Sequence, residues 1–336
     1  MHLMGRVVVN YISYLLLITV ALLFYSLNAY YMGFLGPQTW RLLLWLALAY
    51  VVLGLPYYYA RGKDYQGSGF KAVLAMLHII ELVKLYLSGE KAYQIPKDQK
   101  ASLMFLLVKF FYIPLLLNFV FIHQTDFMPY LSLFFRGLPD VSIHALLLNY
   151  FFPLIVITIF ALDTLWYSFG YLFSFSFLGN RIRSVEPTVL GWGVTLICYP
   201  PFNDSFSLFF AWNVGDKILL PQLWLTYTFR VAILLLFLIF LFSTFALGAK
   251  CSNLTNRGIV SRGPYRFVRH PAYTSKVIAW WVMTLPFLSL SLVIAALAWT
   301  AIYIARAITE ERHLSLDPDY KEYSKKVKWR FIPGVL

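Results

Sequence analysis

Long apolar stretches separated by short basic ones are the main pattern along the chain. A membrane-spanning helix needs about 20 mostly apolar residues in a row. Stretches that meet or approach this length are 7–32, 38–60, 102–123, 141–170, 187–201, 219–248 and 272–306. The last one contains Pro286 and is long enough to form a hairpin of two shorter helices. The pattern predicts an all-α, polytopic transmembrane bundle with about eight spans.

Two further segments read as lying in the membrane interface rather than crossing the bilayer. Residues 71–88 mix Lys71, Glu81 and Lys84 with leucines, which is typical of an amphipathic interfacial helix. The run 127–137 is a second candidate for this position. The first apolar stretch follows Arg6 and has no small-residue cleavage site, so it is expected to be an uncleaved span.

The distribution of Lys and Arg predicts which side of the membrane each loop occupies. If the N-terminus is cytoplasmic, the inside segments hold 23 of the 28 basic residues and the outside loops hold 3. Cytoplasmic loops are enriched in Lys and Arg, so both termini are expected in the cytoplasm. This assignment requires the short stretch 187–201 to cross the membrane, because otherwise all later loops change sides.

Composition supports a membrane protein and argues against two other classes. Hydrophobic residues make up 60% and charged residues 13% of the chain, against about 45–50% and about 25% in soluble domains. The net charge of +13 comes largely from basic residues that flank apolar runs, so a nucleic-acid surface is not predicted. The two cysteines, Cys198 and Cys251, form no metal-binding pattern and are expected to be free thiols, with no metal bound.

Charged residues inside predicted spans are costly and often functional. Lys109 lies near the inner end of its span and can extend its ammonium group to the interface. Arg230 lies deeper and is expected to be a hydrogen-bonded structural residue. Asp163 lies near the inner end of its span, where either a cytoplasmic pocket or a structural partner could use it.

Candidate chemistry is concentrated after the sixth apolar stretch. Residues 256–273 read N-R-G-I-V-S-R-G-P-Y-R-F-V-R-H-P-A-Y. Glycine and proline fix turns, and arginines offer forked donors for carboxylate or phosphate. Such a loop at a membrane surface could hold a polar, ring-bearing small molecule. The alternative is an ordinary basic cytoplasmic loop with interfacial tyrosines.

A charged helical segment follows the predicted hairpin. Arg306 and Glu310 are four residues apart and share one helix face. They form either an exposed ion pair or one side of a charged patch. Because the hairpin carries the chain out and back, His270 and Glu310 are expected to lie near each other on the cytoplasmic face.

These motifs together resemble the isoprenylcysteine carboxyl methyltransferase family, whose relatives include membrane phospholipid N-methyltransferases. The resemblance covers roughly residues 250–333. It rests on Gly263-Pro264-Tyr265-Arg266, Arg269-His270-Pro271-x-Tyr273, Glu310-Glu311-x-x-Leu314 and Tyr320-x-x-Tyr323, with the hairpin between the second and third. The chain departs from the family where Thr274-Ser275 replace a usual glycine, although serine is small enough to preserve close helix packing.

The resemblance implies an S-adenosylmethionine-dependent methyltransferase whose acceptor is lipid-like and enters from the bilayer, such as an isoprenylcysteine carboxylate. The cofactor pocket is expected to face the cytoplasm, in a bacterial inner membrane or the endoplasmic reticulum. By analogy, Arg306 and Glu310 are catalytic. The residues expected at the cofactor are Tyr265, Arg269, His270, Pro271, Tyr273 and Glu311.

Two other functions stay open at the level of sequence. Sterol reductases, which use NADPH, carry a related Arg-His-Pro-x-Tyr loop, but Ala272 stands here where they usually have asparagine. The other alternative is a transporter or scaffold fused to a degenerate domain. The expected division of the chain is a transmembrane region of about six spans at 1–248 and a methyltransferase-like catalytic region at 249–336.

Overall fold

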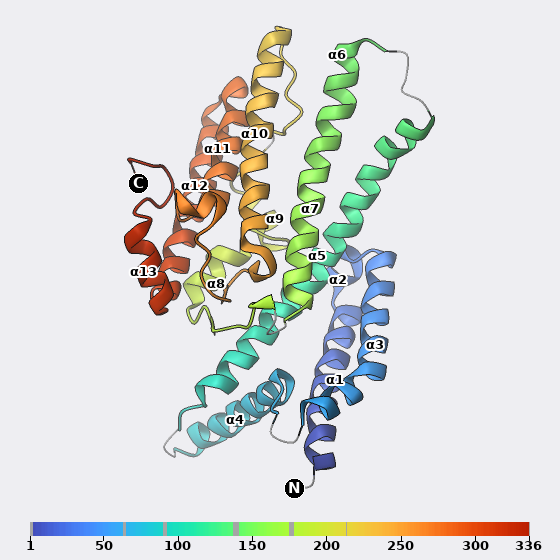
Figure 1. The fold of residues 1–336 in the computed structure, drawn as a ribbon, viewed down its shortest axis with the longest axis vertical. Helices are drawn as coiled ribbons and strands as arrows, with labels where there is room; N and C mark the ends of the chain where they lie inside the picture. The colour runs from blue at the N-terminus through green and yellow to red at the C-terminus, as the bar shows by residue number, and fades with distance from the viewer. Residues whose placement is uncertain are drawn as a thin grey trace. The chain divides into compact units, whose positions relative to one another are not determined.

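The computed structural model describes residues 3–62, 65–89, 93–136, 141–174, 178–212 and 214–335, and nearly all of their regular structure is helical (Figure 1). Among these residues, six helices are long and apolar enough to cross a membrane. They are Gly5–Leu27, Pro37–Arg61, Lys97–Leu133, Ile143–Leu172, Leu223–Lys250 and Leu290–Leu314. The predicted all-α, multi-spanning architecture agrees with this result. The count of eight spans and the cytoplasmic termini stay predictions.

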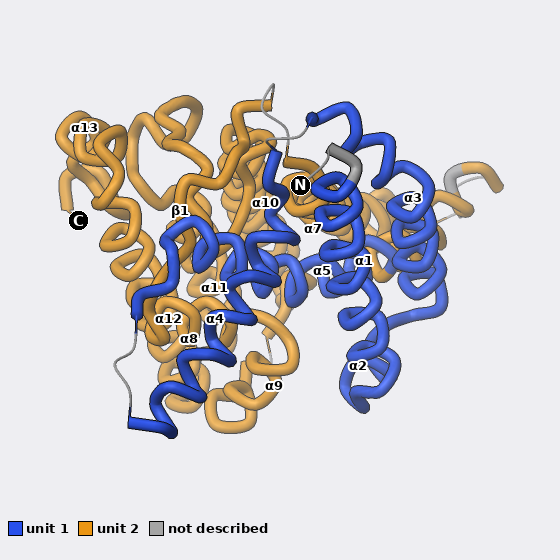
Figure 2. The backbone as a smooth tube through the Cα atoms, turned by 90° about the horizontal axis from the view of Figure 1, so that it is seen from below, with its two compact units in different colours: residues 1–121 blue, residues 122–336 orange. Residues whose placement is uncertain are grey.

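The chain divides into two compact units, residues 1–121 and 122–336 (Figure 2). In unit 1, buried asparagines join separate helices. The Asn118 side-chain oxygen accepts hydrogen bonds of 2.8 Å from the Gly36 amide and from the Thr39 hydroxyl. The helices of unit 1 are α1 Leu3–Leu27, α2 Ala29–Phe34, α3 Pro37–Arg61, α4 Ser68–Ser88 and the first part of α5 Lys97–Arg136. Helix α4 covers the predicted amphipathic segment, and α5 continues through most of the run 127–137.

Unit 2 holds every residue of the candidate chemistry. Its elements after α5 are α6 Ile143–Leu146, η1 Leu147–Phe151, α7 Phe152–Leu172, β1 Ser184–Val185, α8 Val189–Leu196, α9 Phe202–Ser207, α10 Leu223–Leu247, η3 Gly248–Lys250, β2 Thr255–Asn256, η4 Gly263–Arg266, α11 Pro271–Thr284, η5 Leu285–Phe287, α12 Leu290–Leu314 and α13 Pro318–Lys326. The two short strands pair antiparallel, with Ser184 opposite Asn256 and Val185 opposite Thr255.

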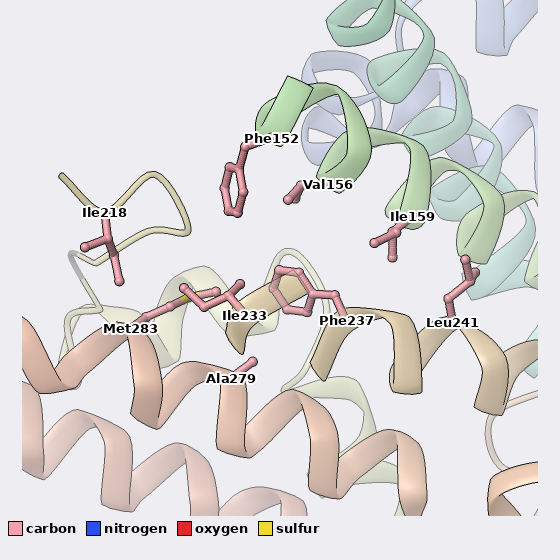
Figure 3. Packing of buried hydrophobic residues seen from close by; sticks show 9 residues of the cluster. All are labelled: Phe152, Val156, Ile159, Ile218, Ile233, Phe237, Leu241, Ala279 and Met283. Atoms are coloured by element: carbon pink, nitrogen blue, oxygen red, sulfur yellow. The ribbon is translucent and has the colours of Figure 1, made fainter. Parts of the chain in front are cut away.

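The core of unit 2 lies between α7, α10 and α11 (Figure 3). Close packing of these apolar side chains holds the three helices together through van der Waals contacts, because lipid tails are equally apolar and supply no hydrophobic driving force between helices. Figure 3 shows α10 between the other two helices, with Phe237 and Ile233 at the centre. The buried residues of this cluster are Phe152, Val156, Ile159, Ile218, Ile233, Phe237, Leu241, Ala279 and Met283.

The predicted hairpin is present and breaks where the sequence indicated. Helix α11 ends at Thr284, the turn η5 contains Pro286, and α12 begins at Leu290. The Ser289 hydroxyl caps α12 by accepting a hydrogen bond from the Leu292 amide. The hairpin therefore returns the chain to the end of unit 2 where α11 begins.

The predicted helical span at 187–201 is wrong in its extent. Helix α8 has eight residues and is about 12 Å long at 1.5 Å per residue, whereas a hydrocarbon core is about 30 Å thick. The chain nevertheless crosses unit 2 here. Ser184 contacts His313 at the C-terminal end of α12. Phe206 packs on Trp299, which lies nearer the start of the same helix. Ile218 then contacts Arg230 in the first half of α10. A helix is replaced by irregular backbone packed against protein, where its polar groups can find partners.

Arg230 is hydrogen-bonded within the protein, as expected. The turn η1 is π-helical, and the Phe152 amide bonds to the Leu147 carbonyl. In this π-helical pattern each amide bonds to the carbonyl five residues earlier, so the donor to the Leu148 carbonyl would be residue 153. That residue is a proline, which has no N–H. The Leu148 carbonyl is therefore free to accept a hydrogen bond from Arg230, whose Nε also donates to the Ile218 carbonyl at 2.7 Å.

The C-terminal half of α7 fixes the loop that follows α10. Asp163 has a structural partner, because the Thr244 hydroxyl donates to its carboxylate at 2.6 Å. Further along α7, the Gly170 carbonyl accepts a 2.5 Å hydrogen bond from Arg257. A β-carbon on Gly170 would overlap the carbonyl oxygen of Cys251. The absence of a side chain at residue 170 is thus what allows this close approach.

Gly170→Ala is expected to destabilise the protein by about 1–3 kcal/mol, because the added methyl group overlaps fixed backbone. The direction of this stability change is informative, because alanine normally stabilises a helix interior relative to glycine by about 0.5–1 kcal/mol. Gly193→Ala in α8 is the matched control, because its β-carbon would meet nothing within 4 Å. Thermal unfolding in detergent measures both variants. Equal midpoints for the two would contradict the close contact.

Candidate active site

Proline and glycine position the loop between α10 and α11. Gly263 has a φ of +60°, a conformation that favours glycine, and Pro264 follows it at the start of η4. Pro271 is the first residue of α11, where its missing N–H costs nothing. Ser275 is buried in the first turns of α11 and donates to the Pro271 carbonyl at 2.9 Å. The predicted turn residues therefore do set the path of the chain here.

Glu311 on α12 is the acceptor at the centre of a hydrogen-bonded group. Arg269 Nε donates to one carboxylate oxygen at 2.7 Å, and His270 Nε2 lies 3.1 Å from the same oxygen. Arg330 Nε donates to the other oxygen at 2.9 Å. An ionised carboxylate only accepts, so His270 Nε2 is the donor of this hydrogen bond. We call Arg269, His270, Glu311 and Arg330 the Glu311 cluster.

The C-terminal tail is bound to the loop by backbone hydrogen bonds. The amides of Arg269 and His270 donate to the carbonyls of Trp329 and Arg330, each at 2.9 Å. The Tyr323 hydroxyl of α13 donates to the Tyr265 carbonyl at 2.7 Å. Loop, α12 and tail thus form one hydrogen-bonded assembly.

A small cavity lies directly beside this assembly. Its volume of about 30 Å³ is large enough for a water molecule or a small polar group. A bound cofactor would therefore place only a small polar group there unless the surrounding loops move. The cavity is lined by Glu186, Gly191, Thr195, Ser252, Asn253, Leu254, Thr255, Tyr273, Arg306, Thr309, Glu310, His313 and Leu314.

Arg306 and Glu310 both line this cavity, but they do not pair with each other within the described part of the chain. Arg306 is buried, donates to the Asn253 side chain at 2.5 Å, and lies 4.9 Å from the centroid of the Tyr273 ring. Glu310 accepts a 2.8 Å hydrogen bond from the Tyr273 hydroxyl. The alternative of an exposed ion pair is wrong, because α8 and the loop 252–255 cover this face of α12.

The residues singled out from sequence fall into two neighbouring groups. Tyr273, Arg306 and Glu310 line the cavity. Arg269, His270 and Glu311 bind one another, and the His270 ring stacks on Tyr273 with centroids 5.4 Å apart. Pro271 begins the helix that carries Tyr273, and Tyr265 packs against the α13 residues Tyr320 and Tyr323. The hairpin therefore brings loop and α12 together as expected.

Sequence reasoning missed Asn253, Glu186 and His313, all of which line the cavity. Asn253 precedes Leu254, a non-glycine residue with a φ of +62°. A side chain in this region is strained, and such strain is concentrated at functional sites. Glu186 follows the two-residue strand β1, which carries no periodicity that would reveal it. Only the pairing of β1 with β2 brings it to α12.

A larger cavity of about 820 Å³ lies toward the other end of α11. A row of packed aromatic rings connects this cavity to the smaller one. Trp280, which lines the larger cavity, packs on Tyr303, and Tyr303 packs on Tyr273. We place the chemistry at the smaller cavity, because that one holds the buried charged residues. The larger cavity is lined by His123, Thr125, Asp126, Pro129, Tyr130, Pro153, Val156, Ile157, Phe160, Trp212, Val214, Gly215, Asp216, Lys217, Phe237, Trp280 and Met283.

Cys251 and Asp317 are among the described groups outside the spans whose pKa values are shifted by burial and hydrogen bonding. Burial raises the pKa of the Cys251 thiol, which is free, as is Cys198. A protonated thiol is a poor nucleophile. Burial alone would raise the pKa of Asp317, but hydrogen bonds from Arg183 and Asn256 at 2.8 and 2.7 Å lower it below its ordinary value. Asp317 also caps α13 through the Asp319 amide.

Asp317→Asn is expected to lower stability at pH 7 by about 1 kcal/mol, because a charged hydrogen-bond acceptor is lost and Arg183 is 46% exposed. The pKa of Asp317 is lower in the folded than in the unfolded protein. The ionised carboxylate therefore contributes its full stabilisation above about pH 3.9, and this contribution is lost as the pH falls through the folded-state pKa. The difference between the unfolding midpoints should therefore shrink in acid. Asp319→Asn, an exposed partner of the same arginine, is the control. A pH-independent difference would contradict the assignment.

Comparison with known proteins gives one match, which covers this region. Residues 231–317 match the model of the phospholipid methyltransferase family. No curated protein and no solved structure matches the chain. The matched region includes the loop, the hairpin and all eight residues singled out as catalytic or cofactor-binding, and it favours a methyltransferase over a reductase. The C-terminal part of this integral membrane protein thus matches the phospholipid methyltransferase family model, in agreement with the resemblance of residues 250–333.

Proposed function

We propose that the chain is an S-adenosylmethionine-dependent methyltransferase that acts on a lipid-like acceptor in the membrane. The observation that carries this proposal is the convergence of Tyr273, Arg306 and Glu310 on one cavity beside the Glu311 cluster. A buried arginine and a glutamate with separate partners can each engage a ligand without first breaking an ion pair between them. The family match of the same region supports the transfer of a methyl group.

Bound S-adenosylmethionine supplies an electrophilic methyl group on a sulfonium, so the protein's task is mainly to align the reactants and exclude water. The residues around the cavity suit the charged end of this cofactor. Glu310 offers a carboxylate to a cationic group, and the stacked rings of His270 and Tyr273 form an aromatic wall behind it. The Tyr273 hydroxyl holds the Glu310 carboxylate in place.

The acceptor is proposed to be a lipid-like molecule with a carboxylate or an amine. The Arg306 guanidinium could orient a carboxylate such as that of an isoprenylcysteine, because arginine binds carboxylates through paired donors. Glu310 could accept the proton released by an amine acceptor. The aromatic residues Tyr303 and Trp280 extend from the site along α11 and α12, and they would suit the apolar part of the molecule.

The basic loops favour a cytoplasmic position for this end of unit 2. Lys and Arg are concentrated in residues 250–276 and 306–330, which form the loop and the tail at the cavity. The positive-inside rule places such segments in the cytoplasm. The proposed enzyme would thus receive its soluble cofactor from the cytoplasm and its acceptor from the bilayer.

Methyl transfer by the purified full chain in lipid vesicles tests the proposal. The assay follows a labelled methyl group from S-adenosylmethionine into N-acetylfarnesylcysteine or phosphatidylethanolamine. Glu310→Gln and Arg306→Met are each expected to lower turnover about 100-fold or more, since such groups contribute factors of about 10²–10⁴. Tyr273→Phe should have a smaller effect, because it removes only the hydroxyl that orients Glu310.

Glu322→Gln is the matched control, since Glu322 is an exposed residue of α13 paired with Lys326. It should leave turnover unchanged. Unfolding midpoints show whether each variant is folded. Full turnover in both the Glu310 and the Arg306 variants would overturn the proposed site.

A further inference from the structure

Glu186 is a buried carboxylate that the matched region does not include. It lies directly after β1 and its side chain is only 3% exposed. One carboxylate oxygen, Oε1, accepts hydrogen bonds from the Thr188 amide at 3.1 Å and from Arg312 Nη2 at 3.3 Å. These contacts, with the Thr188 hydroxyl, fix the orientation of the carboxylate. Glu186 is thus held in place before any ligand arrives.

The second oxygen, Oε2, has no hydrogen-bond donor among the described residues. The His313 ring is close by, but its Nδ1 lies 3.8 Å away, beyond hydrogen-bonding distance. The other ring nitrogen of His313 bonds to the Ser184 hydroxyl at 2.8 Å. Buried polar atoms are nearly always satisfied, and an exception in a cavity points to a missing partner.

The chain keeps space for this carboxylate. A β-carbon on Gly191 would lie 2.5 Å from both Cγ and Cδ of Glu186. Any residue other than glycine at position 191 would therefore push the Glu186 side chain out of its present position. Glu186 and Gly191 line the same cavity as Arg306 and Glu310.

The charges around the cavity favour a cation. Two carboxylates, Glu186 and Glu310, and one buried arginine, Arg306, line it. Arg312 contacts Glu186 from the outer side and is about half exposed, so water weakens its compensation of the charge. A cation with N–H donors would satisfy Oε2 and balance the second carboxylate.

We infer that Glu186 binds an alkylammonium group that enters this cavity. The inference rests on the proposed function, because it assigns a ligand group to the same site. The ammonium group has two possible sources, the amino acid portion of the cofactor and the amine of an acceptor. A small cationic group of this kind suits a cavity of about 30 Å³.

Calorimetry on the purified full chain tests the first source with two probes. S-adenosylhomocysteine carries the ammonium group, and 5′-methylthioadenosine shares the adenosine and thioether but lacks it. If the cofactor supplies the cation, Glu186→Gln should weaken binding of S-adenosylhomocysteine at least tenfold and leave 5′-methylthioadenosine unaffected. Gly191→Ala should act in the same direction, since it displaces the carboxylate without removing it.

Methyl incorporation tests the second source at saturating cofactor. If the acceptor supplies the cation, Glu186→Gln should raise the KM for phosphatidylethanolamine in vesicles at least tenfold while cofactor binding is unchanged. The KM for N-acetylfarnesylcysteine, which presents a carboxylate, should not rise. Glu322→Gln again serves as the control for loss of a carboxylate.

The outcomes separate this inference from the proposed function. A wild type that fails to bind S-adenosylhomocysteine would overturn the proposed function and this inference with it. Wild-type binding together with a Glu186→Gln variant that matches the wild type in both measurements would overturn this inference alone. Equal losses for the ammonium-bearing and ammonium-free probes would also overturn it, because they would indicate a general structural role.

Discussion

The geometry of the site depends on one buried carboxylate, that of Glu311. It accepts hydrogen bonds from Arg269 and His270 in the loop before α11 and from Arg330 in the tail. A buried carboxylate is tolerated only when it is paired and hydrogen-bonded, so each segment depends on the other two. Removing one donor would leave the carboxylate with fewer hydrogen-bond partners beside α12. The loop and the tail are thereby fixed around the end of α12.

The neighbouring residue, Glu310, has different surroundings from Glu311 because of the geometry of the helix. Successive residues on an α-helix point about 100° apart, because 3.6 residues make one turn. Glu311 therefore faces the loop and tail, while Glu310 faces the cavity and Tyr273. In this account one glutamate holds the assembly and the other is available to a ligand. Replacing them should have distinguishable effects.

Packing further from the site supplies the frame for this assembly. The core between α7, α10 and α11 fixes the helix that begins with Pro271. Gly170 and Arg257 hold the loop after α10 against α7 and thereby place Asn253 beside Arg306. The irregular segment that includes α8 and α9 covers α12 and contributes Glu186. The cavity therefore combines the matched region with residues from outside it.

Much of this arrangement could be predicted from local pattern. The length of the apolar runs indicated the long helices, and Pro286 indicated the break in the hairpin. The hairpin then required the loop and the end of α12 to lie together, which the contact of Tyr273 with Glu310 bears out. These features depend on residues close in sequence, so the spacing of apolar residues and prolines is enough to predict them.

Other features depend on contacts that no local pattern encodes. The stretch 187–201 is apolar enough to be taken for a span, because a short buried helix and part of a spanning helix have the same composition. Glu186 and Asn253 reach the cavity through a two-residue strand pair and a strained loop. The partner of Arg230 is the carbonyl that Pro153 leaves without a donor. Such pairings require the three-dimensional path of the chain.

Hydrogen–deuterium exchange at the amides of Arg269 and His270 tests the central role of Glu311 most directly. These amides donate to the tail carbonyls of Trp329 and Arg330. With Glu311→Gln, the account predicts that exchange at both amides accelerates at least tenfold, while Glu322→Gln leaves it unchanged. Unaltered protection in the Glu311 variant would contradict the account, because loop and tail would then be held together without this carboxylate.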